Sequence, residues 1–132
     1  MSVHNDKIEN TQSEKIVTGF CQAWASLNLE RIMEFFTDDA VYFNIPLKPV
    51  SGKEAIRKTI GGLLKGTTWL EFKILASASN RTTVFNERVD SFEANGKRVS
   101  LPVAGVFETT EGGKIKAWRD YFDLEMFTKQ MR

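Results

Sequence analysis

The second half of this 132-residue chain contains long segments rich in the side chains that favour β-strands, separated by short runs of turn residues. Asn95-Gly96 and Gly112-Gly113 are the clearest of these turns, and Asn-Gly is a strong hairpin signal. Such segments joined by short turns predict consecutive antiparallel strands. We expect these strands at residues 69–77, 82–92, 98–109 and 114–122. Consecutive strands of this length restrict the fold because they must form one sheet with an apolar layer against it.

The first half has a helical period. Apolar residues at helical spacing, including Cys21 on the apolar face, predict a helix over 13–27. A short helix should follow, with Asn28 as its cap and Asp38-Asp39 closing it. We expect a strand at 40–45 and a helix from Gly52 to about Leu64, capped by Ser51 and Glu54. A closing helix is expected at 124–131.

These elements predict an α+β fold in which a curved, mostly antiparallel mixed sheet is covered by the N-terminal helices. A long curved sheet covered in this way makes a cone with a deep apolar pocket. Pro102 fits a β-bulge or an edge, where a bend would help to form the curve. The length predicts one domain over residues 13–132, preceded by a polar tail, residues 1–12, that we expect to be disordered.

Composition excludes several classes of function. The net charge of +1 argues against a nucleic acid or an anionic membrane as partner. No apolar run approaches the ~20 residues of a membrane span, and Cys21 has no second cysteine for an internal disulfide, so a cytoplasmic location is expected. The only histidine, His4, lies in the polar tail. Histidine-based nucleophilic catalysis and a metal site are therefore not expected, and no cofactor is implied.

Three strand segments carry polar side chains that are expensive to bury without a purpose. Residues two apart on a strand share a face, so Arg88 lies beside Asp90. In the same way Asp120 lies beside Trp118 and Phe122, and Tyr42 beside Asn44. If these faces border one cavity, the result is a pocket with apolar walls and a polar base. The alternative is a solvated strand face that carries a local Arg88–Asp90 ion pair.

Together these groups could activate water without a metal or a histidine. The fork of Arg88 can donate to both carboxylates at once, and the pair then titrates as a unit. Asp120, Asn44 and Tyr42 can orient a water, while a protonated Asp90 donates to a leaving oxygen. The reaction class is hydrolysis by attack at carbon. Spacing alone leaves open which aspartate holds the proton.

At these residues the chain resembles the limonene-1,2-epoxide hydrolase family, within the nuclear-transport-factor-2-like (SnoaL-like) cone folds. The resemblance implies that Asp120 is the base, Asp90 the acid and Arg88 the bridge, with Tyr42 and Asn44 holding water. It also implies a homodimer and one-step opening of a small epoxide to a vicinal diol, with no covalent intermediate. Pocket-wall positions are matched by Phe92, Leu101, Val103, Trp118 and Phe122, and Cys21 stands where a pocket methionine is familiar. The matching runs are 15–17, 42–47, 87–90, 105–107 and 118–124.

Two other functions fit the same cone. One is an isomerase or polyketide-cyclase-like enzyme, which would use a carboxylate base with a donor that stabilises an oxyanion. The other is a non-catalytic binding module, which fold alone does not exclude. Neither needs an arginine between two aspartates, so Arg88 favours the epoxide hydrolase.

Overall fold

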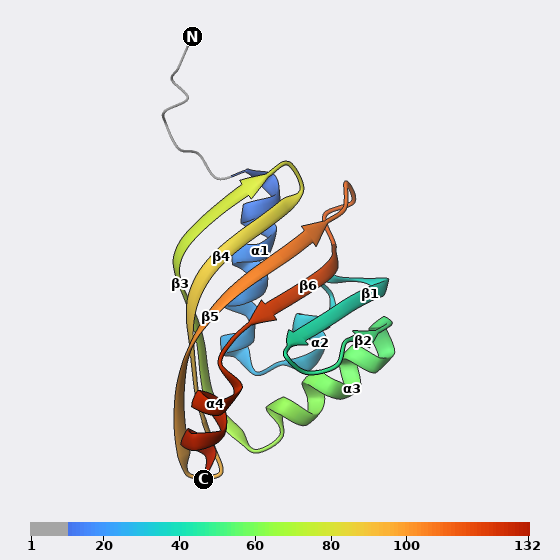
Figure 1. Cartoon of the computed structure of the whole chain (residues 1–132). Helices are drawn as coiled ribbons and strands as arrows, with labels where there is room; N and C mark the ends of the chain where they lie inside the picture. The colour runs from blue at the N-terminus through green and yellow to red at the C-terminus, as the bar shows by residue number, and fades with distance from the viewer. Residues whose placement is uncertain (1–10) are drawn as a thin grey trace.

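A single six-stranded sheet forms the body of the computed structural model, which describes residues 11–132 (Figure 1). The strand order is β2-β1-β6-β5-β4-β3, and every neighbouring pair is antiparallel except β1 and β6, which are parallel. The expected α+β class with a mixed, mostly antiparallel sheet is confirmed. The strands are β1 (Phe36–Ile45), β2 (Val50–Ser51), β3 (Thr67–Asn80), β4 (Thr83–Ala94), β5 (Lys97–Thr109) and β6 (Ile115–Tyr121).

The N-terminal helices follow the predicted apolar period. Helix α1 (Gln12–Ala23) continues into a 3₁₀ turn, η2 (Trp24–Ser26), and α2 (Leu29–Met33) begins after Asn28, whose side chain accepts from the backbone N–H of Arg31. The side chain of Thr11 caps α1 in the same manner. Residues 11 and 12 therefore belong to the folded domain rather than to the tail. His4 and the remainder of the expected tail lie outside the described residues.

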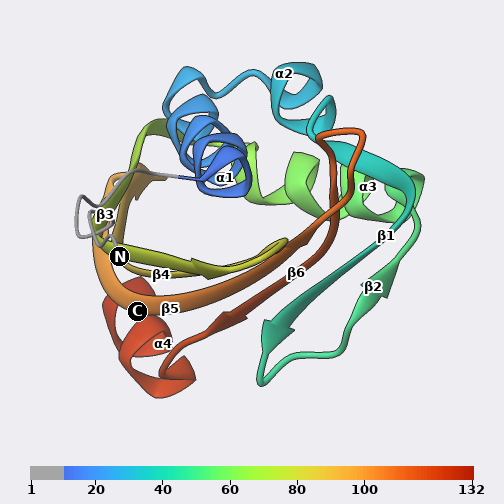
Figure 2. The ribbon, with the colours of Figure 1, turned by 90° about the horizontal axis from the view of Figure 1, so that it is seen from above.

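The sheet curves around these helices. Figure 2 shows α1, α2 and α3 (Lys53–Leu64) on the inner side of the curve that runs from β3 to β1. Phe20 of α1 is at the centre of the core, where its ring makes edge contacts with Phe36, Phe107 and Trp118. A rigid aromatic layer therefore supports the strand faces that carry the buried polar side chains.

Some local predictions are wrong in detail. Helix α2 ends at Met33, and Asp38-Asp39 lies within β1 because the chain is already extended from Phe36. Ser51 pairs with Val41 as part of β2, a strand the sequence did not predict, and helix α3 has Gly52 as its N-cap with no side-chain cap. The expected capping box is therefore not formed.

Pro102 lies in β5, where a β-bulge or a sheet edge was expected, and the structure has it at an edge. The β4–β5 register is unbroken at Val89↔Pro102, so there is no bulge. Strand β6 pairs with β5 only from Ala104 onward, which leaves the other edge of β5 free at Pro102. Gln130 of the closing helix α4 (Leu124–Met131) bonds that edge through the N–H and C=O of Ser100. Because alternate residues face the same edge, Pro102 removes no ladder hydrogen bond.

Candidate active site

Strand register brings the five predicted polar residues to one place in the sheet. Asn44 of β1 lies opposite Asp120 of β6, and Tyr42 lies opposite Trp118. Asp120 in turn pairs with Gly105 of β5. Gly105 pairs with Asn86 of β4, two residues before Arg88. The polar faces of three strands therefore meet, as the hypothesis of a shared pocket requires.

Arg88 lies between the two aspartates and is fully buried, with 0% of its surface exposed. Its Nε and Nη2 donate to the two oxygens of Asp90 at 2.9 and 2.8 Å. Its Nη1 and Nη2 donate to the two oxygens of Asp120 at 3.2 and 2.7 Å. The guanidinium also stacks over Phe72, 5.0 Å from the ring centre. The interpretation of Arg88–Asp90 as a solvated surface pair is therefore wrong.

Asn86 completes the coordination of the guanidinium. Its Oδ1 accepts from Arg88 Nη1 at 3.0 Å, so all five N–H groups of Arg88 have an acceptor. The Asn86 amide also donates to the Cys21 thiol at 3.8 Å. Asn86 has no role in the hypothesis drawn from the sequence, although its position two residues before Arg88 puts it on the same strand face.

Gly105 makes room for this network. A Cβ on residue 105 would lie 2.5 Å from Arg88 Nη1, 2.8 Å from Asp120 Oδ1 and 3.0 Å from Asn86 Oδ1. These distances are shorter than a normal carbon contact of about 3.5 Å or more. The cluster therefore needs a residue without a side chain at the point where β5 passes under it.

Burial changes the proton affinities of the groups in the site. Desolvation raises the pKa of Asp90 from 3.8 to about 6, against the lowering effect of Arg88 and with a further increase from Asp120. Burial also raises the pKa of Tyr42 well above its usual range, again with a contribution from Asp120. The pKa of Cys21 rises to about 12 for the same first reason. Tyr42 and Cys21 are therefore neutral at physiological pH.

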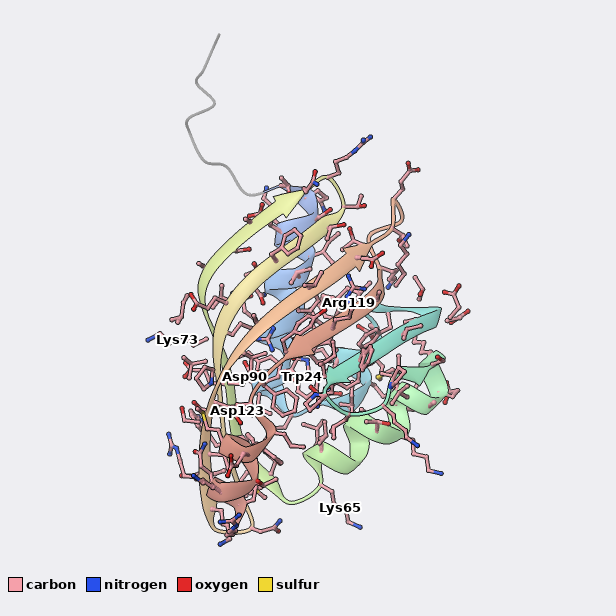
Figure 3. All side chains as sticks on the ribbon, viewed as in Figure 1. Trp24, Lys65, Lys73, Asp90, Arg119 and Asp123 are labelled. Atoms are coloured by element: carbon pink, nitrogen blue, oxygen red, sulfur yellow. The ribbon has the colours of Figure 1, made fainter. Side chains whose placement is uncertain are left out.

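A cavity of about 340 Å³ borders this cluster. Asp90, Asp120, Tyr42 and Asn44 all line it, whereas Arg88 lies behind its wall. In Figure 3 the labelled Asp90 lies in the middle of the molecule, while the labelled Lys73 points outward. The cavity thus has a polar region of acid–base groups within a mostly apolar wall.

Five of the six predicted pocket residues line the cavity: Phe92, Leu101, Val103, Trp118 and Phe122. Cys21 does not, because it is buried beneath the wall against Asn86. Sequence reasoning missed the walls supplied by η2, β3, the end of α3 and α4, since nothing in a single sequence shows which elements meet across a cavity. These missed residues include Trp24, Leu63, Leu70, Phe72, Leu124, Phe127 and Met131.

Residues 11–132 contain no group of three or more His, Cys, Asp or Glu side chains that could hold a metal ion. None of the helices in that range is long and apolar enough to cross a membrane.

Fold and site together define a cone-shaped α+β protein with an Asp–Arg–Asp cluster beside its pocket. A solved structure from Shewanella denitrificans, named a putative SnoaL-like polyketide cyclase, has this fold, with a TM-score of 0.84, 11% identity, and 92% of this chain and 98% of that chain covered. The model of the limonene-1,2-epoxide hydrolase catalytic domain matches residues 11–132. The chain belongs to that family.

A similar sequence and a similar solved structure both come from Mycobacterium tuberculosis. Epoxide hydrolase EphG is 31% identical over 117 residues, which cover 88% of this chain and 77% of that protein. The solved structure of an epoxide hydrolase of the limonene-epoxide-hydrolase-like type has a TM-score of 0.81 and 28% identity, with 93% of this chain and 91% of that chain covered.

Proposed function

We propose that this protein is an epoxide hydrolase that converts a small apolar epoxide to a vicinal diol by direct attack of water. The observation that carries the proposal is a fully buried arginine shared between two carboxylates on the wall of an apolar cavity. Such a cluster is costly to bury and suits a reaction that needs an acid and a base at fixed positions. Family membership and the similar mycobacterial sequence and structure support the same activity.

In the proposed reaction Asp90 is the general acid and Asp120 the general base. The water oxygen forms a bond to one epoxide carbon while the C–O bond at that carbon breaks. The electron pair of the broken bond stays on the epoxide oxygen, which takes the proton of Asp90, and Asp120 takes a proton from the water. The raised pKa of Asp90 supports its role because it holds its proton to higher pH than an ordinary aspartate. Return of one proton from Asp120 to Asp90 restores the starting state.

Tyr42 and Asn44 are proposed to hold the attacking water. Register places Asn44 directly opposite Asp120, and Tyr42 two residues before it on the same face. The raised pKa of Tyr42 keeps its hydroxyl protonated, so that it can donate to the water oxygen. The side-chain amide oxygen of Asn44 and the carboxylate of Asp120 can each accept one hydrogen of the water. One lone pair on the water oxygen is then left for attack.

The substrate is proposed to be small and apolar. A cavity of about 340 Å³ lies near the lower end of ordinary ligand sites. Its wall includes Leu70, Phe92, Leu101 and Val103, which exclude bulk water from a reacting epoxide. A cyclic or terpene-like skeleton matches this volume and lining.

Turnover of a panel of cyclic and terminal epoxides in ¹⁸O-water tests the function. We expect a vicinal diol with one ¹⁸O per molecule. A single turnover in labelled water should leave the protein carboxylates unlabelled, because the attack is direct. Absence of diol across the panel would falsify the hydrolase, and ring-closed or isomerised products would favour the cyclase or isomerase alternative. Label in Asp90 or Asp120 would show a covalent ester instead.

We also propose that the protein is a homodimer, as family membership suggests. The outer face of the sheet exposes apolar rings such as Phe85 and Tyr121, which lie on the side opposite to the site. Contact between two chains across this face would remove these rings from water. Sedimentation velocity at micromolar concentration should show the mass of two chains, and the mass of one chain would contradict the proposal.

A further inference from the structure

Trp118 contributes a hydrogen bond that its expected role as a pocket wall does not include. Its indole Nε1–H donates to Asp120 Oδ1 at 2.7 Å, and both side chains are buried. The indole ring is stacked on Tyr42 with a centroid distance of 4.2 Å and an interplanar angle of 13°. The indole ring also packs against the rings of Phe107 and Phe20. Because aromatic rings hold the indole in place, its N–H direction is fixed.

This bond makes the two carboxylates unequal. Arg88 donates two hydrogen bonds to Asp90 and two to Asp120, so it does not distinguish between them. Trp118 gives Asp120 a third N–H donor. Burial does not account for a charge on Asp120, since both carboxylates are almost completely shielded from solvent, with Asp120 4% exposed and Asp90 9%. The indole bond is therefore the feature in the described structure that favours the charge on Asp120.

The same bond selects one oxygen of Asp120. A carboxylate has about four lone-pair positions, two on each oxygen. On Oδ1 both positions are used, by Arg88 Nη1 and by Trp118 Nε1. On Oδ2 one is used by Arg88 Nη2. A single lone pair on Oδ2 is left to accept a proton.

We propose that Trp118 is a positioning residue that holds the negative charge of the aspartate pair on Asp120 and leaves Oδ2 as the basic atom. The inference rests on the proposed function for its catalytic meaning, but the charge assignment is a property of the resting protein. The groups that face Asp120 are Arg88 and Asp90 of β4, Tyr42 of β1 and the Cys21 thiol of α1. Tyr42 and Cys21 stay neutral, so Arg88 and Trp118 carry the stabilisation.

Trp118→Phe is the test variant, because it keeps an aromatic ring and removes the donor. Trp24→Phe is the matched control. The indole of Trp24 belongs to the same aromatic cluster, 5.6 Å from that of Trp118, and its N–H has no partner among residues 11–132. One variant therefore loses a hydrogen bond to Asp120 and the other does not.

The first measurement is the pH dependence of kcat/KM for diol formation. Loss of one donor to a carboxylate should move the acid limb of Trp118→Phe upward by about 1 to 2 pH units. The limb of Trp24→Phe should stay at the wild-type pH, whatever happens to its KM. An unmoved limb in Trp118→Phe, or an equal shift in both variants, would overturn the proposal.

The second measurement does not need activity. The ¹³Cγ resonances of Asp90 and Asp120 in wild-type protein at pH 5 should show a protonated Asp90 and an ionised Asp120, and Trp118→Phe should move the Asp120 signal toward the protonated value. A wild-type spectrum with the proton on Asp120 refutes the assignment even if the variant fails to fold. If wild-type protein makes no diol but gives the expected spectra, the proposed function fails and the role of Trp118 stands.

Discussion

Replacement of Gly105 by alanine tests whether the geometry of the Asp–Arg–Asp cluster matters as we infer. The added methyl group would lie 2.5 Å from Arg88 Nη1 and 2.8 Å from Asp120 Oδ1. Ordinary contact needs about 3.5 Å or more, so Nη1 has to move by roughly 1 Å. The Nη1 bonds to Asn86 and Asp120, now 3.0 and 3.2 Å long, would then exceed hydrogen-bond distance.

The size of the effect follows from these two bonds. Each hydrogen bond to a charged group contributes about 1.5–3 kcal/mol, and overpacking a buried site costs about 1–3 kcal/mol. We expect Gly105→Ala to lower the free energy of unfolding by about 3 kcal/mol or more. A displacement of about 1 Å in a catalytic group costs on the order of 100-fold in rate, so kcat for diol formation should fall by about that factor.

Urea unfolding and steady-state kinetics, measured side by side, check this prediction. Gly112→Ala is the control, since a Cβ on that turn residue meets only Thr110 Oγ1, at 3.7 Å. It should leave both quantities near their wild-type values. If Gly105→Ala keeps wild-type stability and kcat, the guanidinium is not held as tightly as the hydrogen bonds indicate, and the reasoning is refuted.

Five further outcomes are expected. Asp90→Asn and Asp120→Asn should each abolish diol formation while the circular dichroism spectrum is retained; near-normal turnover in either would refute its role. Because Asp90 must be protonated to act, kcat/KM should fall as pH rises through about 6, the raised pKa of this group. The same shift means that protonated Asp90 stabilises the fold below pH ~4 and that this stabilisation is lost as pH rises to about 6. Urea unfolding should therefore show the free energy of unfolding of wild-type protein falling by up to about 3 kcal/mol over this range, relative to that of Asp90→Asn. Arg88→Lys should lower kcat at least 100-fold, since an ammonium has three donors where the guanidinium here uses five. Phe127→Ala opens the cavity wall, so it should raise KM with little change in kcat.

Strand alternation was sufficient to predict which polar residues share a face. Arg88 with Asp90, and Tyr42 with Asn44, follow from the two-residue period alone. Their meeting did not follow, because it depends on the parallel pairing of β1 with β6, which places Asn44 opposite Asp120. The family resemblance supplied that link before the structure did.

Contacts that depend on side-chain direction were not predictable. The Trp118 indole was expected only as pocket wall, although two-residue spacing from Asp120 already made a hydrogen bond geometrically possible. Cys21 was expected in the pocket because it matches a pocket position of the family, but its side chain is buried beneath the cavity wall. Helix periodicity identifies the buried face and does not show what each buried side chain contacts.

The charge of the cluster explains why an acid and a base coexist in it. Arg88 carries one positive charge, and two ionised aspartates would leave a net charge of −1 among groups that are almost completely shielded from solvent. Burial of a net charge is far more costly than burial of a neutral hydrogen-bonded group. One proton on the pair restores neutrality, and the raised pKa of Asp90 shows where burial favours it. Below that pKa a carboxylic acid and a carboxylate can lie on either side of a permanently charged arginine, which is the protonation state that the proposed opening of an epoxide by water requires.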